Sequence, residues 1–340
     1  MNKKLLALLL AILMVAMSAV AMAADQQYSG NDLSNGFLTI KKTYQNSPSV
    51  IPAEEIHFTV SNPNVEQSSD PSGTKFPTVT VEAKPASAAQ IANAIKVSLP
   101  TDMDRAGVFT YTITETAGNT AGVTYNPGGA SMQLAVLVGF DTNGAYEIKY
   151  VKVANTSAPA TKIDEFTFEN KFEDGSFTLT KEIEGDLANT TSEFPVKVTL
   201  TSAKPVLNSI AISAVNGTTT NTNPTAAAAW TGNDTDGYKS ETTVYVTNNT
   251  QITFANIPVG VEVAIEETQL TVDGVAYTAD YNDYSKAAMT TAGLTATITN
   301  TANATVDTGV RTDTMPYILL MAFVAILAVA FVAKKRSVNE

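Results

Sequence analysis

The sequence predicts an all-β protein that consists of two tandem β-sandwich domains. Segments rich in β-branched and aromatic residues recur along the chain, with turn-forming Asn, Gly, Pro and Asp residues between them. The body of the chain has no sustained helical period. A length of 340 residues with 44% hydrophobic residues leaves room for two hydrophobic cores.

The expected strands are short and mostly alternate between apolar and polar residues. In the first half of the body they are residues 37–44, 55–60, 109–115, 132–140 and 166–172. In the second half they are residues 177–183, 194–201, 242–247, 252–257, 261–267 and 294–300. A turn is expected at Asp174-Gly175, between the last strand of the first half and the first strand of the second.

The two ends of the chain carry targeting signals. A basic start and an apolar run precede a small-x-small site at residues 21–23, so we expect residues 1–23 to be a signal peptide. Residues 317–333 form an apolar run of about the minimum length for a membrane span, and the basic residues 334–336 follow it. The precursor is therefore expected to be exported and to contact the membrane only through its C-terminal tail.

The composition excludes several kinds of site. The chain has no cysteine and one histidine, His57, which removes disulfides, Cys-His and Ser-His-Asp catalysis and ordinary zinc chemistry. A formal net charge of −12 disfavours nucleic acid as a partner. We expect no cofactor, no metal and no conventional enzymatic turnover.

The two halves repeat three motifs in the same order. "FLTIKK" and "FTLTKE" open the halves, "YTITE" and "VAIEE" recur inside them, and "FTFEN" and "TATITN" close them. In each motif a polar residue ends an apolar strand face, because alternate side chains of a strand share one face. The residues in phase are Lys42, Glu115 and Asn170 in the first half and Lys181, Glu267 and Asn300 in the second, with the adjacent Lys41 and Glu266 as alternatives.

A lysine, a glutamate and an asparagine that meet in an apolar core predict one specific reaction. Burial disfavours charge, so it favours a neutral amine and a neutral carboxylic acid. The amine then attacks the carbonyl of the asparagine side chain, the acid polarises that carbonyl and relays protons, and ammonia leaves. The product is an amide crosslink that forms once per domain without an external enzyme.

These motifs, with a signal peptide before them and a sorting tail after them, resemble the streptococcal-type major (backbone) pilins of Gram-positive bacteria. The matching segments are "LTIKK", "YTITE", "FTFEN", "FTLTK", "NIPVGVEVAIEE" and "TATITN". The resemblance implies two Ig-like (CnaB-type) domains at residues 30–172 and 173–303, and a sorting signal at residues 304–340. It also implies the isopeptide bonds Lys42–Asn170, promoted by Glu115, and Lys181–Asn300, promoted by Glu267.

The resemblance implies a second covalent reaction, at the tail. Pilins of this type place a sortase signal before the membrane span, where this chain reads Val306-Asp307-Thr308-Gly309, with Asp307 in the usual place of proline. A sortase would cut between Thr308 and Gly309 and transfer Thr308 to an amine. The implied acceptor on the next subunit is Lys162, with Lys152 and Lys149 as alternatives.

The function implied is a structural subunit of a pilus at the cell surface and in the cell wall of a Gram-positive bacterium. Its partners would be a sortase, identical pilin subunits and a cell-wall peptidoglycan precursor, with minor pilins or an adhesin as further partners. The alternative function is a monomeric wall-anchored adhesin or stalk protein that binds a surface ligand.

Overall fold

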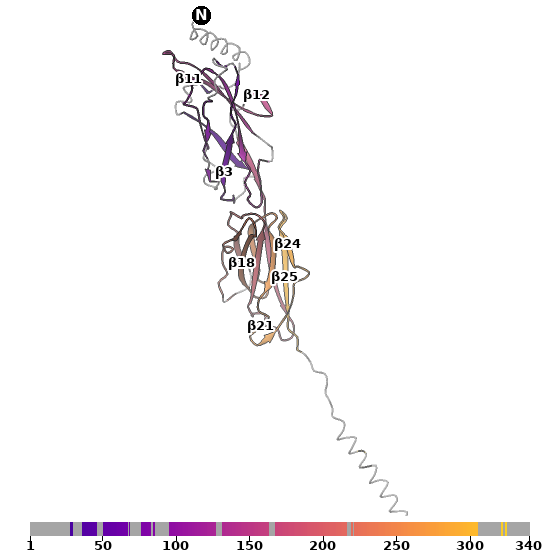
Figure 1. Cartoon of the computed structure of the whole chain (residues 1–340). Helices are drawn as coiled ribbons and strands as arrows, with labels where there is room; N and C mark the ends of the chain where they lie inside the picture. Colours follow the sequence, from indigo (N-terminus) through magenta and orange to yellow (C-terminus); the bar gives the residue numbers. More distant parts are fainter. Residues whose placement is uncertain are drawn as a thin grey trace, which may run out of the picture.

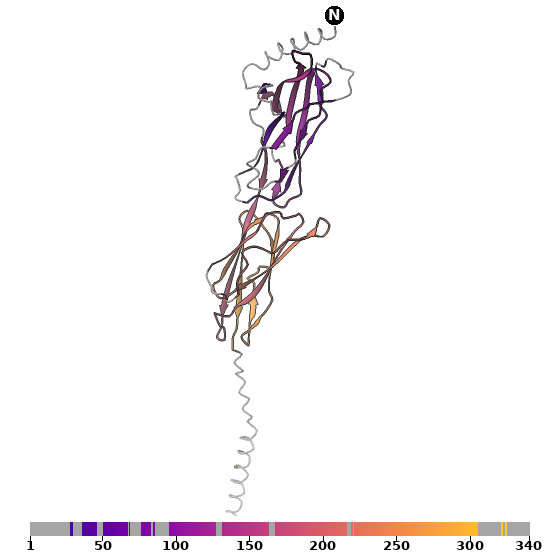
Figure 2. The ribbon, with the colours of Figure 1, turned by 90° about the vertical axis from the view of Figure 1, so that its left-hand side faces the viewer.

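Two β domains lie end to end and form an elongated molecule, as two views at right angles show (Figures 1 and 2). The expected signal peptide and nearly all of the expected membrane span lie outside the residues that the structure describes. Among the described residues, no helix has the length and apolarity needed to cross a membrane. The computed structural model describes residues 28–29, 36–45, 50–66, 68, 76–82, 84–85, 95–126, 131–162, 167–215, 219, 221–304, 321 and 324.

The first domain contains two sheets. The larger sheet has the strand order β1-β11-β10-β8-β3-β6, with β12 beside β11 and β4 beside β8. Its strands are β1 (Tyr28–Ser29), β3 (Glu55–Val60), β4 (Asn64–Glu66), β6 (Lys84–Pro85), β8 (Gly107–Thr116), β10 (Met132–Phe140), β11 (Tyr146–Asn155) and β12 (Ala158–Lys162). The smaller sheet has the order β5-β7-β2-β13-β9. Its strands are β2 (Phe37–Tyr44), β5 (Thr80–Val81), β7 (Ile95–Ser98), β9 (Val123–Thr124) and β13 (Thr167–Phe172).

The second domain also contains two main sheets. One has the order β16-β19-β14-β25-β23, the other has the order β17-β18-β15-β20-β24, and β21 and β22 form a separate hairpin. The strands of the first are β14 (Asp174–Glu184), β16 (Ala211–Val215), β19 (Gln251–Pro258), β23 (Thr278–Asp280) and β25 (Leu294–Thr301). The remaining strands are β15 (Phe194–Ser202), β17 (Thr231–Asn233), β18 (Gly237–Val246), β20 (Glu262–Glu267), β21 (Thr271–Val272), β22 (Val275–Ala276) and β24 (Lys286–Ala288).

Each domain encloses its own hydrophobic core between its two sheets. In the first domain, apolar side chains of β2 and β13 pack against those of β8 and β10. In the second, apolar side chains of β14, β19 and β25 pack against those of β15, β18 and β20. Strict alternation produces this arrangement, since every second residue of β8 and of β15 is buried. The predicted all-β architecture of tandem sandwiches is confirmed, and every segment expected to be a strand contributes to one.

The first and last main strands of each domain are parallel neighbours. β2 pairs with β13, with Lys42 opposite Phe168 and Tyr44 opposite Asn170. β14 pairs with β25 along its length, with Lys181 opposite Ile298 and Ile183 opposite Asn300. The same offset between the lysine and the asparagine therefore occurs in both domains.

The turn expected at Asp174-Gly175 is wrong. Both residues belong to β14, which pairs with β19 from its first residue and has a register shift after Gly175. At this irregularity the backbone of β14 passes close to Thr290, because a Cβ added at Gly175 would lie 2.2 Å from the Thr290 carbonyl oxygen. Glycine fits at this position because it has no Cβ. Only Glu173 therefore separates the last strand of the first domain from the first strand of the second.

Backbone hydrogen bonds fix the junction between the domains. Glu173, the linking residue, donates its N–H to Gly122 of the first domain at 3.0 Å and accepts the N–H of Val259 of the second at 2.9 Å. Ala121 of the first domain also packs into the core of the second. Two more bonds cross the junction, from Ala53 N–H to the Leu207 carbonyl (3.0 Å) and from Ala121 N–H to the Pro205 carbonyl (2.9 Å).

Candidate functional site

The first candidate site lies inside the first domain and joins its two sheets. Lys42 and Asn170 extend inward from the parallel strands β2 and β13, and Glu115 extends toward them from β8 in the facing sheet. All three side chains are buried, with Asn170 fully inaccessible to solvent. They occupy inward positions because each continues the buried face of its own strand.

A single carboxylate bridges the other two groups of this site. Lys42 Nζ donates to Glu115 Oε2 at 2.7 Å, and Asn170 Nδ2 donates to Glu115 Oε1 at 2.8 Å. The remaining polar atom of the amide, Asn170 Oδ1, accepts the backbone N–H of Asn126 at 2.7 Å. A backbone N–H can only donate, so this bond fixes which end of the Asn170 amide is the oxygen.

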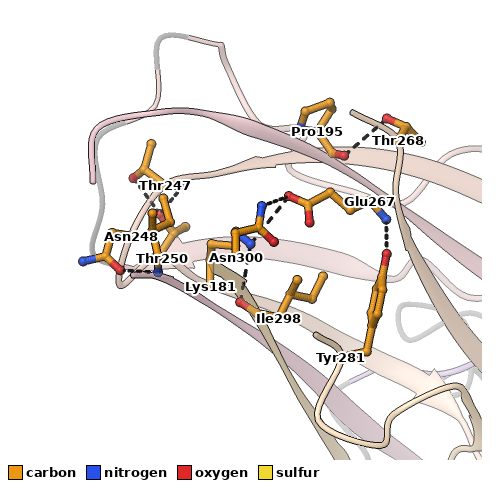
Figure 3. A network of polar contacts seen from close by, with 11 residues as sticks. Lys181, Pro195, Thr247, Asn248, Thr250, Glu267, Thr268, Tyr281, Ile298 and Asn300 are labelled. Carbon is orange, nitrogen blue, oxygen red and sulfur yellow. Dashed lines mark hydrogen bonds and ion pairs between the residues drawn. The ribbon is translucent and has the colours of Figure 1, made fainter. Parts of the chain in front are cut away.

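The second candidate site repeats the arrangement in the second domain (Figure 3). Asn300 Nδ2 donates to Glu267 Oε1 at 2.8 Å, and Lys181 Nζ lies 3.5 Å from the same oxygen. Lys181 Nζ also lies 3.5 Å from the Ile298 carbonyl and 4.8 Å from the ring centre of Phe194. Among the described residues, Asn300 Oδ1 and Glu267 Oε2 are buried without a hydrogen-bond partner.

The neighbouring residues that were alternatives face the surface. Lys41 is exposed on the outer side of β2. Glu266 is exposed on β20 and forms an ion pair with Lys197 at 2.6 Å. The alternation of each strand therefore directs Lys42 and Glu267 into the cores and their neighbours outward.

Burial dominates the electrostatics of both sites. Desolvation lowers the pKa of Lys42 and lowers the pKa of Lys181 to about 8, against the opposing effect of the facing glutamate in each case. Desolvation also raises the pKa of Glu267, against the opposing effects of Lys181 and Asn300. In both domains the lowered lysine pKa favours the neutral amine that attack on an amide requires, and in the second domain the raised pKa of Glu267 also favours a neutral acid beside it.

A cluster of hydroxyl groups around the buried Glu54 was not anticipated from the sequence. The Glu54 carboxylate accepts hydrogen bonds from the hydroxyls of Tyr44, Tyr125 and, at 2.9 Å, Thr120. Burial and its own hydrogen bond to Glu54 raise the pKa of Tyr125 to about 12. Glu54 is 5% exposed, whereas the adjacent Glu55 is exposed, and only strand phase distinguishes the two in the sequence.

The expected acceptor lysines lie on or beside the edge of the larger sheet of the first domain. Lys162 is the last residue of β12 and pairs with Ala154 of β11. Lys152 and Lys149 lie on β11, and Lys149 forms an ion pair with Glu147. The expected sortase residues, Thr308 and Gly309, lie outside the described residues. Within the described ranges, no cluster of His, Asp or Glu side chains is arranged to hold a metal ion.

Two family models match the chain, one per domain. Residues 38–173 match the family described as the Spy0128-like isopeptide containing domain. Residues 175–306 match a domain of unknown function, DUF7601. A search of curated proteins gives no match.

Among the solved structures that match the chain are those of pilus proteins. A crystal structure of the major pilin from Streptococcus pyogenes matches with 16% identity and a TM-score of 0.48, over 79% of this chain and 98% of that chain. The major pilin T-13 from Streptococcus pyogenes matches with 18% identity and a TM-score of 0.47, over 79% and 97%. The pilus-presented adhesin Spy0125 (Cpa) matches with 15% identity and a TM-score of 0.29, over 51% and 37%.

Proposed function

We propose that the protein is a structural subunit of a sortase-assembled pilus of a Gram-positive bacterium, because its N-terminal domain matches the family of Spy0128-like isopeptide containing domains over residues 38–173. The observation that carries the proposal is the buried Lys–Glu–Asn triad that occurs in both domains at the same offset between parallel strands. Its members in the two domains are Lys42, Glu115 and Asn170, and Lys181, Glu267 and Asn300.

The proposed reaction in each domain joins the lysine to the asparagine. The lysine Nζ attacks the asparagine Cγ, a proton passes from Nζ to Nδ2, and Nδ2 leaves as ammonia while the new Nζ–Cγ amide forms. Glu115 and Glu267 carry the proton, since each contacts both nitrogens of its site. The fold supplies proximity, for which well-oriented intramolecular reactions show effective molarities of about 10⁵ M or more.

The position of the proposed bonds suits a protein that carries tension. A pull on the two ends of a domain acts on its first and last strands, which are parallel neighbours and would slide past one another. A covalent bond between these strands passes the load from one to the other without unfolding the chain between them. The proposed link is an amide and the chain has no cysteine, so thiol reductants do not break it.

We place the inter-subunit bond between Thr308 of one subunit and Lys162 of the next. Lys162 ends β12, in the part of the first domain that lies away from the second, whereas the continuous described chain ends at residue 304, at the far end of the second domain (Figure 1). A joint between two different ends of a molecule is heterologous, and its repetition gives an open filament. The precursor would be held by its tail until the sortase releases Gly309 and the residues after it.

Polymerisation is tested in cells that express the full chain with its cognate sortase. Wild type is expected to give a ladder of high-mass species that survives boiling in detergent. Lys162→Ala is expected to give only wall-anchored monomer, and deletion of Thr308 and Gly309 to remove both the ladder and the anchoring. A ladder that persists in Lys162→Ala moves the acceptor to Lys152 or Lys149. Absence of the ladder in wild type favours a monomeric stalk or adhesin.

A further inference from the structure

We propose that the backbone N–H of Asn126 is a catalytic group of the first domain, which stabilises the negative charge on Asn170 Oδ1 as Lys42 attacks. The inference rests on the proposed crosslinking reaction and adds a group to it. Asn126, which is partly buried, donates its N–H to Oδ1 of the fully buried Asn170 at 2.7 Å. A preorganised donor aimed at an oxygen that gains charge is the arrangement of an oxyanion hole.

The donor and the glutamate act on opposite ends of the same amide. Glu115 contacts Lys42 Nζ with one oxygen and Asn170 Nδ2 with the other, so it faces the nucleophile and the leaving nitrogen and not Oδ1. As the Nζ lone pair forms the bond to Cγ, the carbonyl electron pair moves to Oδ1, where the Asn126 N–H holds it. Glu115 accepts the proton of Nζ and gives it to Nδ2, ammonia leaves, and the carbonyl forms again.

The Glu54 cluster holds this donor in place. Tyr125, the residue before Asn126, donates its hydroxyl to Glu54 and accepts the N–H of Thr120 at 3.1 Å. Asn126 itself has a φ of 41°, a left-handed conformation that asparagine tolerates better than most residues. Glu54 and Tyr125 are thus positioning residues, because they act on the reaction only through the chain that presents the N–H.

The second domain provides an internal reference. Asn300 Oδ1 has no hydrogen-bond partner among the described residues, so no backbone donor plays the same part there. Loss of the Asn126 N–H should therefore slow crosslinking in the first domain alone. The rates of the two domains can be followed in one molecule, because the two crosslinks join different pairs of peptides.

The test removes the single N–H and leaves every side chain in place. Residues 24–304, which contain both hydrophobic cores, are synthesised in a cell-free system with the α-hydroxy analogue of asparagine at position 126. The resulting backbone ester lacks the donor. Crosslinked peptides of each domain are quantified by mass spectrometry at successive times. The matched control is the same ester at Asn143, whose N–H bonds the Asp141 side chain in an exposed turn.

We expect the ester at Asn126 to slow crosslinking of the first domain by roughly 10²-fold relative to the second, as for loss of one oxyanion donor. The ester at Asn143 should leave the ratio unchanged. Tyr125→Phe should slow the first domain by about tenfold, a smaller effect because the displaced donor is still present. Asn126→Gly keeps the N–H and tolerates a positive φ, so the first domain of this variant should crosslink at the wild-type rate.

A folding defect is separated from a chemical one by hydrogen exchange. In a Glu115→Ala background, which blocks the reaction, the ester at Asn126 should leave the amides of β2 and β13 protected. An unchanged rate ratio with the ester, while both domains crosslink, would overturn the role of Asn126. If the amides of β2 and β13 stay protected from hydrogen exchange while the ester slows crosslinking of the first domain, the result would support the role of Asn126. Absence of ammonia loss from both domains of wild type would instead refute the crosslinking reaction itself.

Discussion

Lys181 and Asn300 lie on neighbouring parallel strands, with Asn300 two residues beyond the position opposite Lys181, and both side chains are fully buried. Lys42 and Asn170 have the same relation in the first domain. Diagonal neighbours on one face of a sheet lie within reach of a long side chain. The flexible lysine stem therefore brings its nitrogen to the amide without distortion of either strand.

Each glutamate is expected to be essential for the crosslink of its own domain. Wild-type residues 24–304 should be lighter than their sequence mass by two ammonia molecules, and Glu115→Gln and Glu267→Gln should each be lighter than their own sequence mass by only one, because glutamine cannot carry a proton between the two nitrogens. Glu169→Gln and Glu266→Gln are the matched controls, since both residues are exposed neighbours of the triads. A wild-type mass equal to the sequence mass would exclude both crosslinks.

The two domains should lose stability separately when a lysine is removed. Trp230 is the one tryptophan of the chain and packs against the core of the second domain, so its fluorescence reports the unfolding of that domain. Lys181→Ala should lower the unfolding free energy that this signal measures by about 4 to 5 kcal/mol, the value for closure of a loop of roughly 100 residues. Lys42→Ala should leave it nearly unchanged. Equal shifts for both variants would argue against independent domains.

The crosslinking rate of the second domain should have an optimum in pH. The reactive form of the pair is neutral Lys181 beside protonated Glu267. In this form the pair carries one titratable proton, which is on Glu267. Burial lowers the pKa of Lys181 to about 8 and raises the pKa of Glu267. Above pH 8 the pair loses that proton and the acid is absent, whereas below the pKa of Glu267 the lysine is protonated and cannot attack.

This dependence is measured by mixing two separately purified pieces of the chain, residues 24–292 and a peptide of residues 293–304 that carries β25. Mixing starts the reaction at a chosen pH, and denaturing electrophoresis measures the covalent product. The peptide with Asn300→Ala gives the background at each pH. A rate that continues to rise well above pH 8 would show that Glu267 does not act as an acid.

Gly175 should be needed for the close approach of β14 to the segment after β24. An added Cβ would lie 2.2 Å from the Thr290 carbonyl oxygen and 2.7 Å from the sulfur of the buried Met289. Gly175→Ala is therefore expected to destabilise the second domain by about 1 to 3 kcal/mol, the usual cost of overpacking. The Trp230 signal measures the loss, and Ser176→Ala at the exposed next position is the control.

Strand alternation made much of this arrangement predictable. In "FTLTKE" and "TATITN" the polar residue continues an apolar strand face, and this pattern predicts that Lys181 and Asn300 lie inside the core. The order of the motifs, repeated in both halves, indicates that the three residue types belong together. The architecture of two sandwiches follows from the same alternation, because each strand has one buried face.

Other features depend on tertiary context that the sequence does not display. Asn126 contributes a backbone N–H, which every residue except proline has, so its residue type gives no signal. Glu54 and Glu55 are indistinguishable by composition, although one is buried and the other exposed. Asp174-Gly175 has the composition of a turn, and only its pairing with β19 makes it a strand.

The linker between the domains has a consequence for the shape of a filament. Glu173, the one residue between β13 and β14, is hydrogen-bonded to Gly122 on one side and to Val259 on the other. Bending the molecule at this point requires both bonds to break, so the two domains should turn as one body. An assembled fibre would then bend only at the joints between subunits. Neighbouring joints would be separated by the length of one two-domain subunit.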